Sequence, residues 1–420
     1  MLLESNKLYK LLQKRYSRRI NLDLNRIQKI LKFLGNPELN LKNPINILGS
    51  DGKMSVLTSL KFFLEADNIN ISAFTSPHLY DFRSRIYLKN KFISLRKVLE
   101  LILKIEKTKH RLTLFELLTC IYILAVKEIK NISYNLIESG LLFKKDSTNL
   151  WSAPRAQIIT NINFQHQEWI NPKTIEEICR QKVGFLSKKT TIYIAPQEPK
   201  TLKIIKKILN NNPSKKIYSS NWKINKKKNK IFYADKKHLI PIKTKYINSD
   251  GLINNLGLAI KVALDLGVKK QTIIKTIPRI KFEGRVQYIQ KGKLVKLISD
   301  NEKLLIDGCH SDKSAKNLYI YLKTLKNPIY GIWGMQKNKL PKNFIANFKG
   351  VFKKLTVVKI PNEPNSCSVK DLKKIAFNAG FKVSTAPNIT RAIKNISNKT
   401  KKTIVVFGSL YLVGNLLSKN

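Results

Sequence analysis

Gly49-Ser50-Asp51-Gly52-Lys53 is the segment whose residue types could most directly do chemistry. It follows a compact, mostly apolar stretch, Ile45 to Leu48, that predicts a buried strand, and it precedes Ser55 to Ala66, which has helical periodicity. Glycines at such a turn let backbone N–H groups face phosphate oxygens, and one lysine can reach the β and γ phosphates. The general P-loop pattern also needs a hydroxyl residue directly after the lysine, where Met54 stands. The segment alone therefore leaves a phosphate cradle and an ordinary glycine-containing turn equally open.

The elements around this loop predict a mixed α/β domain. Ile69 to Phe74 is again strand-like, so the loop lies in a β-loop-α-β unit. The longest apolar run, Leu112 to Val126, contains Glu116 and is too short to span a bilayer, so it predicts a buried helix. The lysine-rich stretch 200–245 is expected to be irregular and peripheral. Further strands are expected at Tyr134 to Ile137, Gln157 to Ile162 and Thr190 to Ala195.

The C-terminal part shows a regular alternation of strand-like and helical segments. A helix over Asn254 to Leu266 is followed by Gly284-Arg285, where we place the boundary between domains 1–283 and 284–420. Alternation beyond it predicts a second, smaller, mostly parallel α/β sheet. Its strands are expected at Leu304 to Ile306, Ile329 to Trp333, Leu355 to Ile360, Lys382 to Thr385 and Thr403 to Phe407. A length of 420 residues also favours two domains.

The balance of charge is the most unusual property of the composition. The chain has 79 basic and 27 acidic residues, a net charge of +52, which is typical of a nucleic-acid or anionic-membrane surface. The lysines are spread along the chain, however, with one local peak at Lys226-Lys227-Lys228, and no RNP, helix-turn-helix or zinc-finger pattern accompanies them. We therefore expect no specific nucleic acid partner, although this charge should attract polyanions.

The cysteines and the first residues indicate where the chain acts. No CxxC pair occurs among the widely spaced Cys120, Cys179, Cys309 and Cys367. A disulfide framework or zinc site is therefore not expected, which suits a reducing cytoplasm. The first twenty residues are basic but lack the apolar segment and cleavage site of an export signal, so no membrane association is expected either.

A collinear series of motifs over nearly the whole chain resembles the folylpolyglutamate synthase/dihydrofolate synthase family of the Mur ligase superfamily. That family's loop, G-T-N-G-K-G-S/T, corresponds to residues 49–55, and its T-S-P-H-L is unchanged at residues 75–79. Its F-E-x-x-T, E-V-G-L-G-G-R-L-D-A-T-N, D-H and E-K-A-G correspond to residues 115–119, 138–149, 165–166 and 181–184. Its G-R-x-Q, D-G-A-H-N-P and G-S-L-Y-L-V-G correspond to residues 284–287, 307–312 and 408–414.

The resemblance implies a P-loop-type central domain, which binds ATP, and a Rossmann-like C-terminal glutamate ligase domain. It implies that ATP phosphorylates the carboxylate of dihydropteroate or of a folate, and that the amine of L-glutamate then attacks the acyl phosphate. Such a reaction depends mostly on positioning and charge neutralisation. The implied partners are ATP, L-glutamate and dihydropteroate or folates, with Mg²⁺ as cofactor, and the family also admits a monovalent cation. We expect a monomer in the cytoplasm.

Register with these motifs assigns the site residues. Mg²⁺ would be held by Ser76, Glu138 and His166, although without the family spacing Glu138 and His166 would be typical of a surface carboxylate and an ordinary hydrogen-bonded histidine. The catalytic candidates are Lys53, His310, which keeps a family position in the second domain, and Lys182, which stands where the family carries a carbamylated lysine. Carbamylation needs the neutral amine, which an ordinary lysine pKa of ~10.4 makes scarce at pH 7 unless burial lowers it. ATP would be held by Ser50, Asp51, Gly52, Lys53, Asn255, Arg285 and Asp307.

The resemblance also implies a pterin pocket, formed by segments that lie before and after the phosphate loop. Phe115 could stack on the pterin ring, and a place in the core is an equally good interpretation of this residue. The segments are Leu22, Asp23 and Leu24, then Thr113, Leu114, Phe115 and Glu116, then Lys145, Asp146 and Ser147.

Several positions depart from the family pattern. Met54 and the pair Leu142-Phe143 replace glycines, and Gln165 replaces a carboxylate next to the metal candidate His166. Asp51 keeps the shape of the family's asparagine but adds a negative charge near phosphates. Two other functions therefore stay open beside the ligase: a degenerate relative that binds nucleotide or folate without forming the amide, and a basic nucleic-acid-binding protein.

Overall fold

The computed structural model describes residues 2–17, 22–165, 167–227 and 230–420. The chain divides into two compact units, one formed by Met1–Lys245 with Leu252–Ile280 and the other by Tyr246–Gly251 with Lys281–Asn420. The boundary expected after residue 283 lies close to the end of the larger unit. The roles assigned to the two domains stay predictions.

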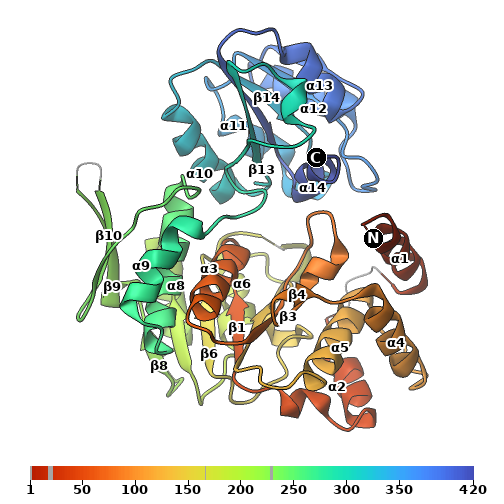
Figure 1. Cartoon of the computed structure of the whole chain (residues 1–420), viewed down its shortest axis with the longest axis vertical. Coiled ribbons are helices and arrows are strands. Elements are labelled where there is room, and N and C mark those ends of the chain that lie inside the picture. Colours follow the sequence, from red (N-terminus) through yellow and green to blue (C-terminus); the bar gives the residue numbers. More distant parts are fainter. Residues whose placement is uncertain (1, 18–21, 166, 228–229) are drawn as a thin grey trace. The chain divides into compact units, whose positions relative to one another are not determined.

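An eight-stranded sheet organises the larger unit, and its order is β4-β3-β2-β5-β1-β6-β7-β8 (Figure 1). The pairs from β2 through β5, β1, β6 and β7 to β8 are parallel, whereas β3 pairs antiparallel with both β2 and β4. The strands are β1 (Pro44–Leu48), β2 (Ile71–Phe74), β3 (Ile86–Leu88), β4 (Lys91–Phe92), β5 (Tyr134–Glu138), β6 (Ala156–Ile159), β7 (Thr191–Ile194) and β8 (Lys215–Ile217).

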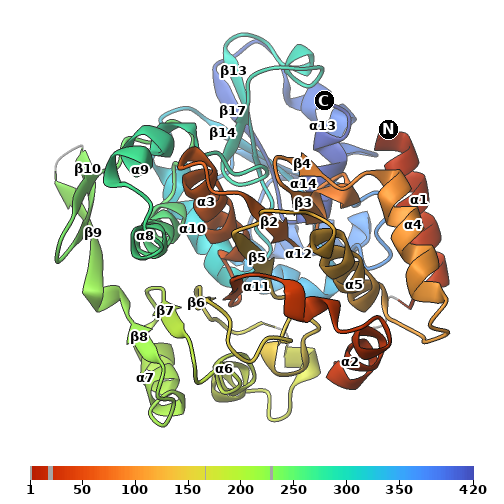
Figure 2. The ribbon, with the colours of Figure 1, turned by 60° about the horizontal axis from the view of Figure 1, so that its bottom comes forward.

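Helices cover both faces of this sheet, which explains why β1 and β2 are buried at every residue. The connection from β1 through α3 (Lys53–Ala66) leads to β2, and the connection from β6 through α6 (Ile175–Val183) leads to β7. The two connections therefore run along the sheet in opposite directions. Because such crossovers are right-handed, the two helices lie on opposite faces. Figure 2 shows α3 and α8 (Asp250–Asp265) on one side and α6 and α7 (Pro199–Ile208) on the other.

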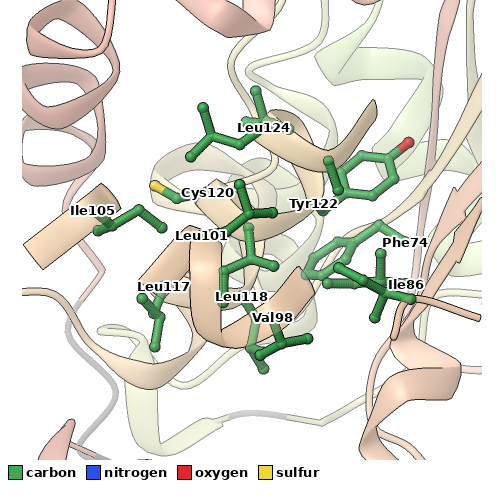
Figure 3. Packing of buried hydrophobic residues seen from close by; sticks show 14 of the residues in the cluster. Phe74, Ile86, Val98, Leu101, Ile105, Leu117, Leu118, Cys120, Tyr122 and Leu124 are labelled. Atoms are coloured by element: carbon green, nitrogen blue, oxygen red, sulfur yellow. The ribbon is translucent and has the colours of Figure 1, made fainter. Parts of the chain in front are cut away.

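A helical layer packs beside β2 and β3 and forms an extensive apolar cluster of this unit. Its centre is α5 (Leu114–Lys127), the buried helix expected from the apolar run, which contacts α4 (Leu95–Glu106) and α2 (Leu24–Phe33). Figure 3 shows the side chains of this cluster, in which the rings of Phe74 and Tyr122 stack with centroids 5.2 Å apart. The N-terminal helix α1 (Leu2–Arg15) packs against the turn at Phe82–Arg85, where the Ser5 hydroxyl donates to Asp81 Oδ1 at 2.6 Å.

The expectation of irregular structure over 200–245 is wrong. After α7 and β8, this stretch forms a three-stranded antiparallel sheet of β9 (Trp222–Lys227), β10 (Lys230–Asp235) and β11 (Leu239–Pro241). Trp222, which is buried, and Ile224 turn towards Gly257 of α8, whereas the lysines of the same strands are exposed. The high lysine content therefore hid an alternating pattern with one apolar face.

The smaller unit is an α/β sheet of order β12-β13-β17-β14-β15-β16, parallel except for the β12–β13 pair. Its strands are β12 (Gln287–Ile289), β13 (Glu302–Asp307), β14 (Ile329–Trp333), β15 (Lys354–Val357), β16 (Val383–Thr385) and β17 (Lys402–Phe407). Its helices are α10 (Asp312–Lys323), α11 (Pro341–Ala346), α12 (Val369–Asn378), α13 (Ile389–Ile396) and α14 (Leu410–Leu417), and α9 (Lys270–Thr276) belongs to the larger unit. The expected α/β fold with two mostly parallel sheets is confirmed.

No helix among the described residues is long and apolar enough to cross a membrane. The four cysteines are buried and free.

Candidate active site

Four neighbouring strands of the large sheet bring the predicted phosphate and metal residues to one edge. In the order β2-β5-β1-β6, the loops that follow β2, β5, β1 and β6 start at the carboxyl ends of parallel strands. The loops after β2, β1 and β6 carry Ser76, Gly49 to Gly52 and the segment 160–165, respectively, and Glu138 is the last residue of β5. Ligands of open parallel sheets bind at this edge, so the topology favours the site that the sequence predicted.

The phosphate loop, residues 49–52, requires both of its glycines. Gly52 has φ +94° and is the N-cap of α3, and a Cβ there would lie 2.7 Å from the side-chain amide of Asn255. A Cβ on Gly49 would overlap the hydroxyl of Thr160. Lys53 Nζ donates to Gly49 O at 3.2 Å and to Ser50 O at 3.3 Å, so its charge lies at the loop. A glycine turn, a helix N-terminus and an ammonium group together are suited to hold phosphate oxygens.

The loop is fastened to the segment that follows β6. Asn161 O accepts hydrogen bonds from Ser50 N at 2.8 Å and from Asp51 N at 3.2 Å. The Ser50 hydroxyl donates to Asn163 O and accepts from Asn163 N, both at 3.1 Å. Asp51 Oδ2 accepts from Asn163 Nδ2 at 2.7 Å and from Gln165 Nε2 at 3.1 Å. The carboxylate at position 51 is therefore held by two amide groups.

The predicted metal ligands are partly brought together. Glu138 ends β5 and is 3% exposed, and its Oε2 accepts a hydrogen bond from Ser76 N at 3.0 Å. His166 lies outside the described residues, and within them no group of three His, Cys, Asp or Glu side chains could hold a metal. A buried carboxylate next to a serine suits a hard cation such as Mg²⁺. The assignment of these three ligands stays a prediction.

Lys182 lies in the last turn of α6, and its side chain is 1% exposed. Its Nζ donates to Gly49 O at 3.0 Å and to Leu141 O, so the amine sits beneath the phosphate loop. Burial, together with the positive charge of Lys53, lowers the pKa of Lys182 to about 7, while Asp146 and Asp51 act in the opposite direction. A large part of this amine is therefore neutral at physiological pH, which is the state that reacts with carbon dioxide.

Leu142 and Phe143, which stand after Glu138 where the family pattern has glycines, have side chains that point into the protein interior. Leu142 and Phe143 are 1% and 0% exposed, and they pack into an apolar cluster with Ile178 and Cys179 of α6. Both side chains therefore anchor the loop to the helix that carries Lys182. Met54 is half-buried in the first turn of α3.

Many residues predicted to line a pterin pocket have a structural role in the loops they occupy. Thr113 and Glu116 form the capping box of α5, and Asp23 caps α2. Asp146 is 3% exposed, and its Oδ2 accepts from Gly140 N at 2.9 Å and Leu141 N at 3.0 Å. These acidic groups therefore already have protein partners.

The remaining pterin candidates are more varied. Phe115 is half-buried between Phe74, with ring centroids 5.7 Å apart, and Gly140, where a Cβ would lie 2.9 Å from the ring. Lys145 is exposed, and the buried Ser147 hydroxyl lies 3.0 Å from that of Thr119. Leu22 and Leu24 are half-buried against apolar clusters, and Leu114 is 8% exposed. A pterin role for these residues stays a prediction.

Sequence reasoning missed two residues of this region. Arg26 Nη2 lies 2.7 Å from Glu116 Oε1, and its Nε donates to Glu116 Oε2 at 3.3 Å, so the pair joins α2 to α5. Asn163 holds Asp51, as described above. Each partner is about a hundred residues away in the sequence, so no local pattern could reveal the contact. Only a search for polar residues after β6 could have singled out Asn163.

The candidates in the smaller unit gather at the carboxyl end of β13. Asp307 is 4% exposed, and its carboxylate accepts from Val286 N at 2.8 Å and Cys309 N at 2.7 Å. Burial raises the pKa of Asp307, and the charge of Arg285 opposes this shift. Val286 has φ +42°, a strained conformation for a β-branched residue. His310 Nδ1 lies 2.9 Å from Gly308 O.

The chain is similar to known proteins over nearly its whole length. The family model described as "Dihydrofolate synthetase, C-terminal domain" matches residues 290–419. The dihydrofolate synthetase of Saccharomyces cerevisiae is 25% identical over 95% of this chain and 97% of its own length. The chain is similar over nearly its whole length to dihydrofolate synthases and folylpolyglutamate synthases, and these matches support a folate ligase.

Further relatives and solved structures are similar over nearly the full length. The dihydrofolate synthase/folylpolyglutamate synthase of Bacillus subtilis is 22% identical, with 94% of each chain covered. The structure of Mycobacterium tuberculosis folylpolyglutamate synthase complexed with ADP superposes with a TM-score of 0.86 at 19% identity, covering 100% of this chain and 98% of that one. Escherichia coli FolC in complex with DHPP and ADP gives a TM-score of 0.84 at 19% identity, covering 98% and 96%. At these identities the structural likeness establishes the folate ligase fold.

Proposed function

We propose that this protein is an ATP-dependent ligase that joins L-glutamate to dihydropteroate, to folylpolyglutamates or to both. The observation that carries the proposal is the juxtaposition of Lys53 and Lys182 at one glycine loop, beside the buried Glu138 at the same sheet edge. Related proteins named dihydrofolate synthase/folylpolyglutamate synthase support it, as does a FolC-type structure with Mn, AMPPNP and L-glutamate bound.

The residues of the loop suit the first half of this reaction. A carboxylate oxygen of the acceptor attacks the γ phosphorus, ADP leaves, and an acyl phosphate forms. The loop N–H groups and Lys53 would hold the phosphates and neutralise the charge that moves to the leaving oxygen. Ser76, Glu138 and His166 would hold Mg²⁺, which would supply positive charge for this neutralisation.

The second half is the attack of the glutamate amine on the acyl carbon, with release of phosphate and loss of a proton from nitrogen. Lys182, as a carbamate, would present an anion beneath the loop, where the neutral lysine presents only an amine. Asn255, Arg285 and Asp307 are proposed to complete the nucleotide site, and His310 remains a catalytic candidate. We further propose that the protein acts in the cytoplasm as a monomer.

An ADP-release assay tests the proposal. Purified protein is given ATP and L-glutamate with dihydropteroate or tetrahydrofolate side by side, each component is omitted in turn, and the product is identified by mass spectrometry. We expect continuous ADP release over many turnovers only with an acceptor and glutamate together. ADP release at the same rate without an acceptor contradicts the proposal.

Two binding measurements made beside this assay separate the two other functions. Nucleotide binding without any glutamylated product identifies a degenerate relative. Tight, strongly salt-dependent binding of unrelated DNA or RNA, without ATP binding, identifies a nucleic-acid-binding protein. The substitutions Leu142 and Phe143 do not favour the degenerate relative, because both side chains are buried in the apolar cluster with α6.

A further inference from the structure

Two of the departures from the family pattern touch each other. The family motifs have an amide at the position of Asp51 and a carboxylate at the position of Gln165, and this chain has the reverse. The two positions are 114 residues apart in sequence, yet Gln165 Nε2 donates to Asp51 Oδ2 at 3.1 Å. One carboxylate and one amide are therefore present in either arrangement, with the same total charge.

The neighbouring contacts hold this pair in place. Asn163 Nδ2 donates to the same Oδ2 at 2.7 Å, and it also donates to Asn161 Oδ1 at 3.2 Å. The backbone bonds from Ser50 and Asp51 to Asn161 fix the loop against this segment from the other side. A carboxylate that accepts two amide donors is well satisfied, and such charge-assisted bonds are stronger than neutral ones.

We propose that Asp51 and Gln165 are an exchanged carboxylate–amide pair, in which Gln165 is a positioning residue that holds the segment after β6 against the phosphate loop. This inference rests on the proposed function, because the loop it orders is the proposed ATP site. The two substitutions are then compensating changes, and neither is a loss of the site.

The charge of the pair also matters for its neighbours. Asp51 opposes the repulsion between Lys53 and Lys182, since it acts to raise the pKa of Lys182. Replacing Asp51 with asparagine removes the charged acceptor of the bonds from Asn163 and Gln165, so the loop is held less firmly in the conformation that binds phosphate. Replacing Gln165 with aspartate, whose side chain is one methylene shorter, puts a second carboxylate near that of Asp51 beside a site for a polyanion, and like charges repel there. Each single change should therefore be harmful, and the two together should cancel.

The test is a double-mutant cycle in the full-length protein with D51N, Q165D and the double variant. Q271D makes the same chemical change as Q165D at an exposed position of α9 and serves as the control. The affinity for AMPPNP with Mg²⁺ is measured by calorimetry, kcat and KM for ATP by ADP release, and folding by thermal unfolding. We expect each single variant to bind AMPPNP about tenfold or more weakly. The double variant should return to within about threefold of the starting protein.

The proposal would be overturned if the two substitutions acted independently, so that the loss of AMPPNP affinity in the double variant equalled the product of the two single losses. It would also be overturned if the Q165D protein bound AMPPNP as tightly as the Q271D protein. Unfolding temperatures lowered in parallel with affinity, with no recovery in the double variant, would also contradict it. Rescue of AMPPNP binding in a protein that shows no turnover would uphold the pair and contradict only the proposed ligase activity. A starting protein that does not bind AMPPNP overturns both.

Discussion

Replacing Lys182 with methionine should remove a pH-dependent cost to the folding of the larger unit. The amine is buried beneath the phosphate loop, and its pKa is lowered to about 7. In the unfolded chain the pKa should have its ordinary value of about 10.4. Between these two values the unfolded chain holds a proton that the folded chain has released. Unfolding then takes up a proton, so stability rises with pH through this window and is lowest below pH 7.

The size of the effect follows from this proton. One proton taken up on unfolding raises the unfolding free energy by about 1.4 kcal/mol per pH unit. Between about pH 7.5 and pH 9, the protein with Lys182 should therefore gain about 2 kcal/mol relative to K182M. Groups that titrate in both proteins cancel from this difference. The exposed Lys188, replaced by methionine in the same way, should give no such pH dependence.

Tryptophan fluorescence can report on the larger unit alone. Trp151, Trp169 and Trp222 belong to it and Trp333 to the smaller unit, so a W333F background isolates its urea transition. The buffers are kept free of carbon dioxide. Equal pH slopes for the two proteins would refute the lowered pKa. Adding ¹³C-bicarbonate to the folded protein should then produce a carbamate signal that K182M lacks, and its absence would refute carbamylation.

Three other substitutions test the loop and its support. Lys53→Ala should lower the rate of ADP release by about a thousandfold or more, and an unchanged rate would remove the phosphate-cradle assignment. Gly52→Ala should cost about 1–3 kcal/mol of stability and weaken AMPPNP binding, because φ is +94° and Asn255 leaves no room for a Cβ; calorimetry and urea unfolding that match the starting protein would contradict this. Phe143→Ala should destabilise the larger unit by about 3–5 kcal/mol in urea unfolding, because its ring is fully buried, and a loss below about 1 kcal/mol would show that the ring is not a core residue.

Local sequence patterns were sufficient to predict most of the helices and strands. A strand, a glycine turn and a helix could be predicted around residues 49–53 because their signals are contiguous in the chain, and β1 and α3 lie there. The alternation after Gly284 predicted the smaller sheet for the same reason. The stretch 200–245 was wrongly expected to be irregular, because lysines on the exposed face masked the apolar residues that pack on α8.

Contacts between distant segments could not be predicted in this way. The pairing of Arg26 with Glu116 depends on which helices pack together, and that of Asp51 with Asn163 and Gln165 on which strands become neighbours. Local periodicity contains neither. For the same reason the sequence could name Lys182 only through family register. Its burial, and hence its lowered pKa, follows from the loops that close over it.

The burial of Phe143 makes its replacement of glycine hard to reverse. A glycine restored at that place today would leave a void among Ile178, Cys179 and their neighbours, and removing a buried phenylalanine costs about 3–5 kcal/mol. Whole domains are stable by only about 5–15 kcal/mol. A single change of Phe143 to glycine would therefore use up a large part of that margin. Any variant designed to open the loop after Glu138 needs a second change that refills this space beside α6.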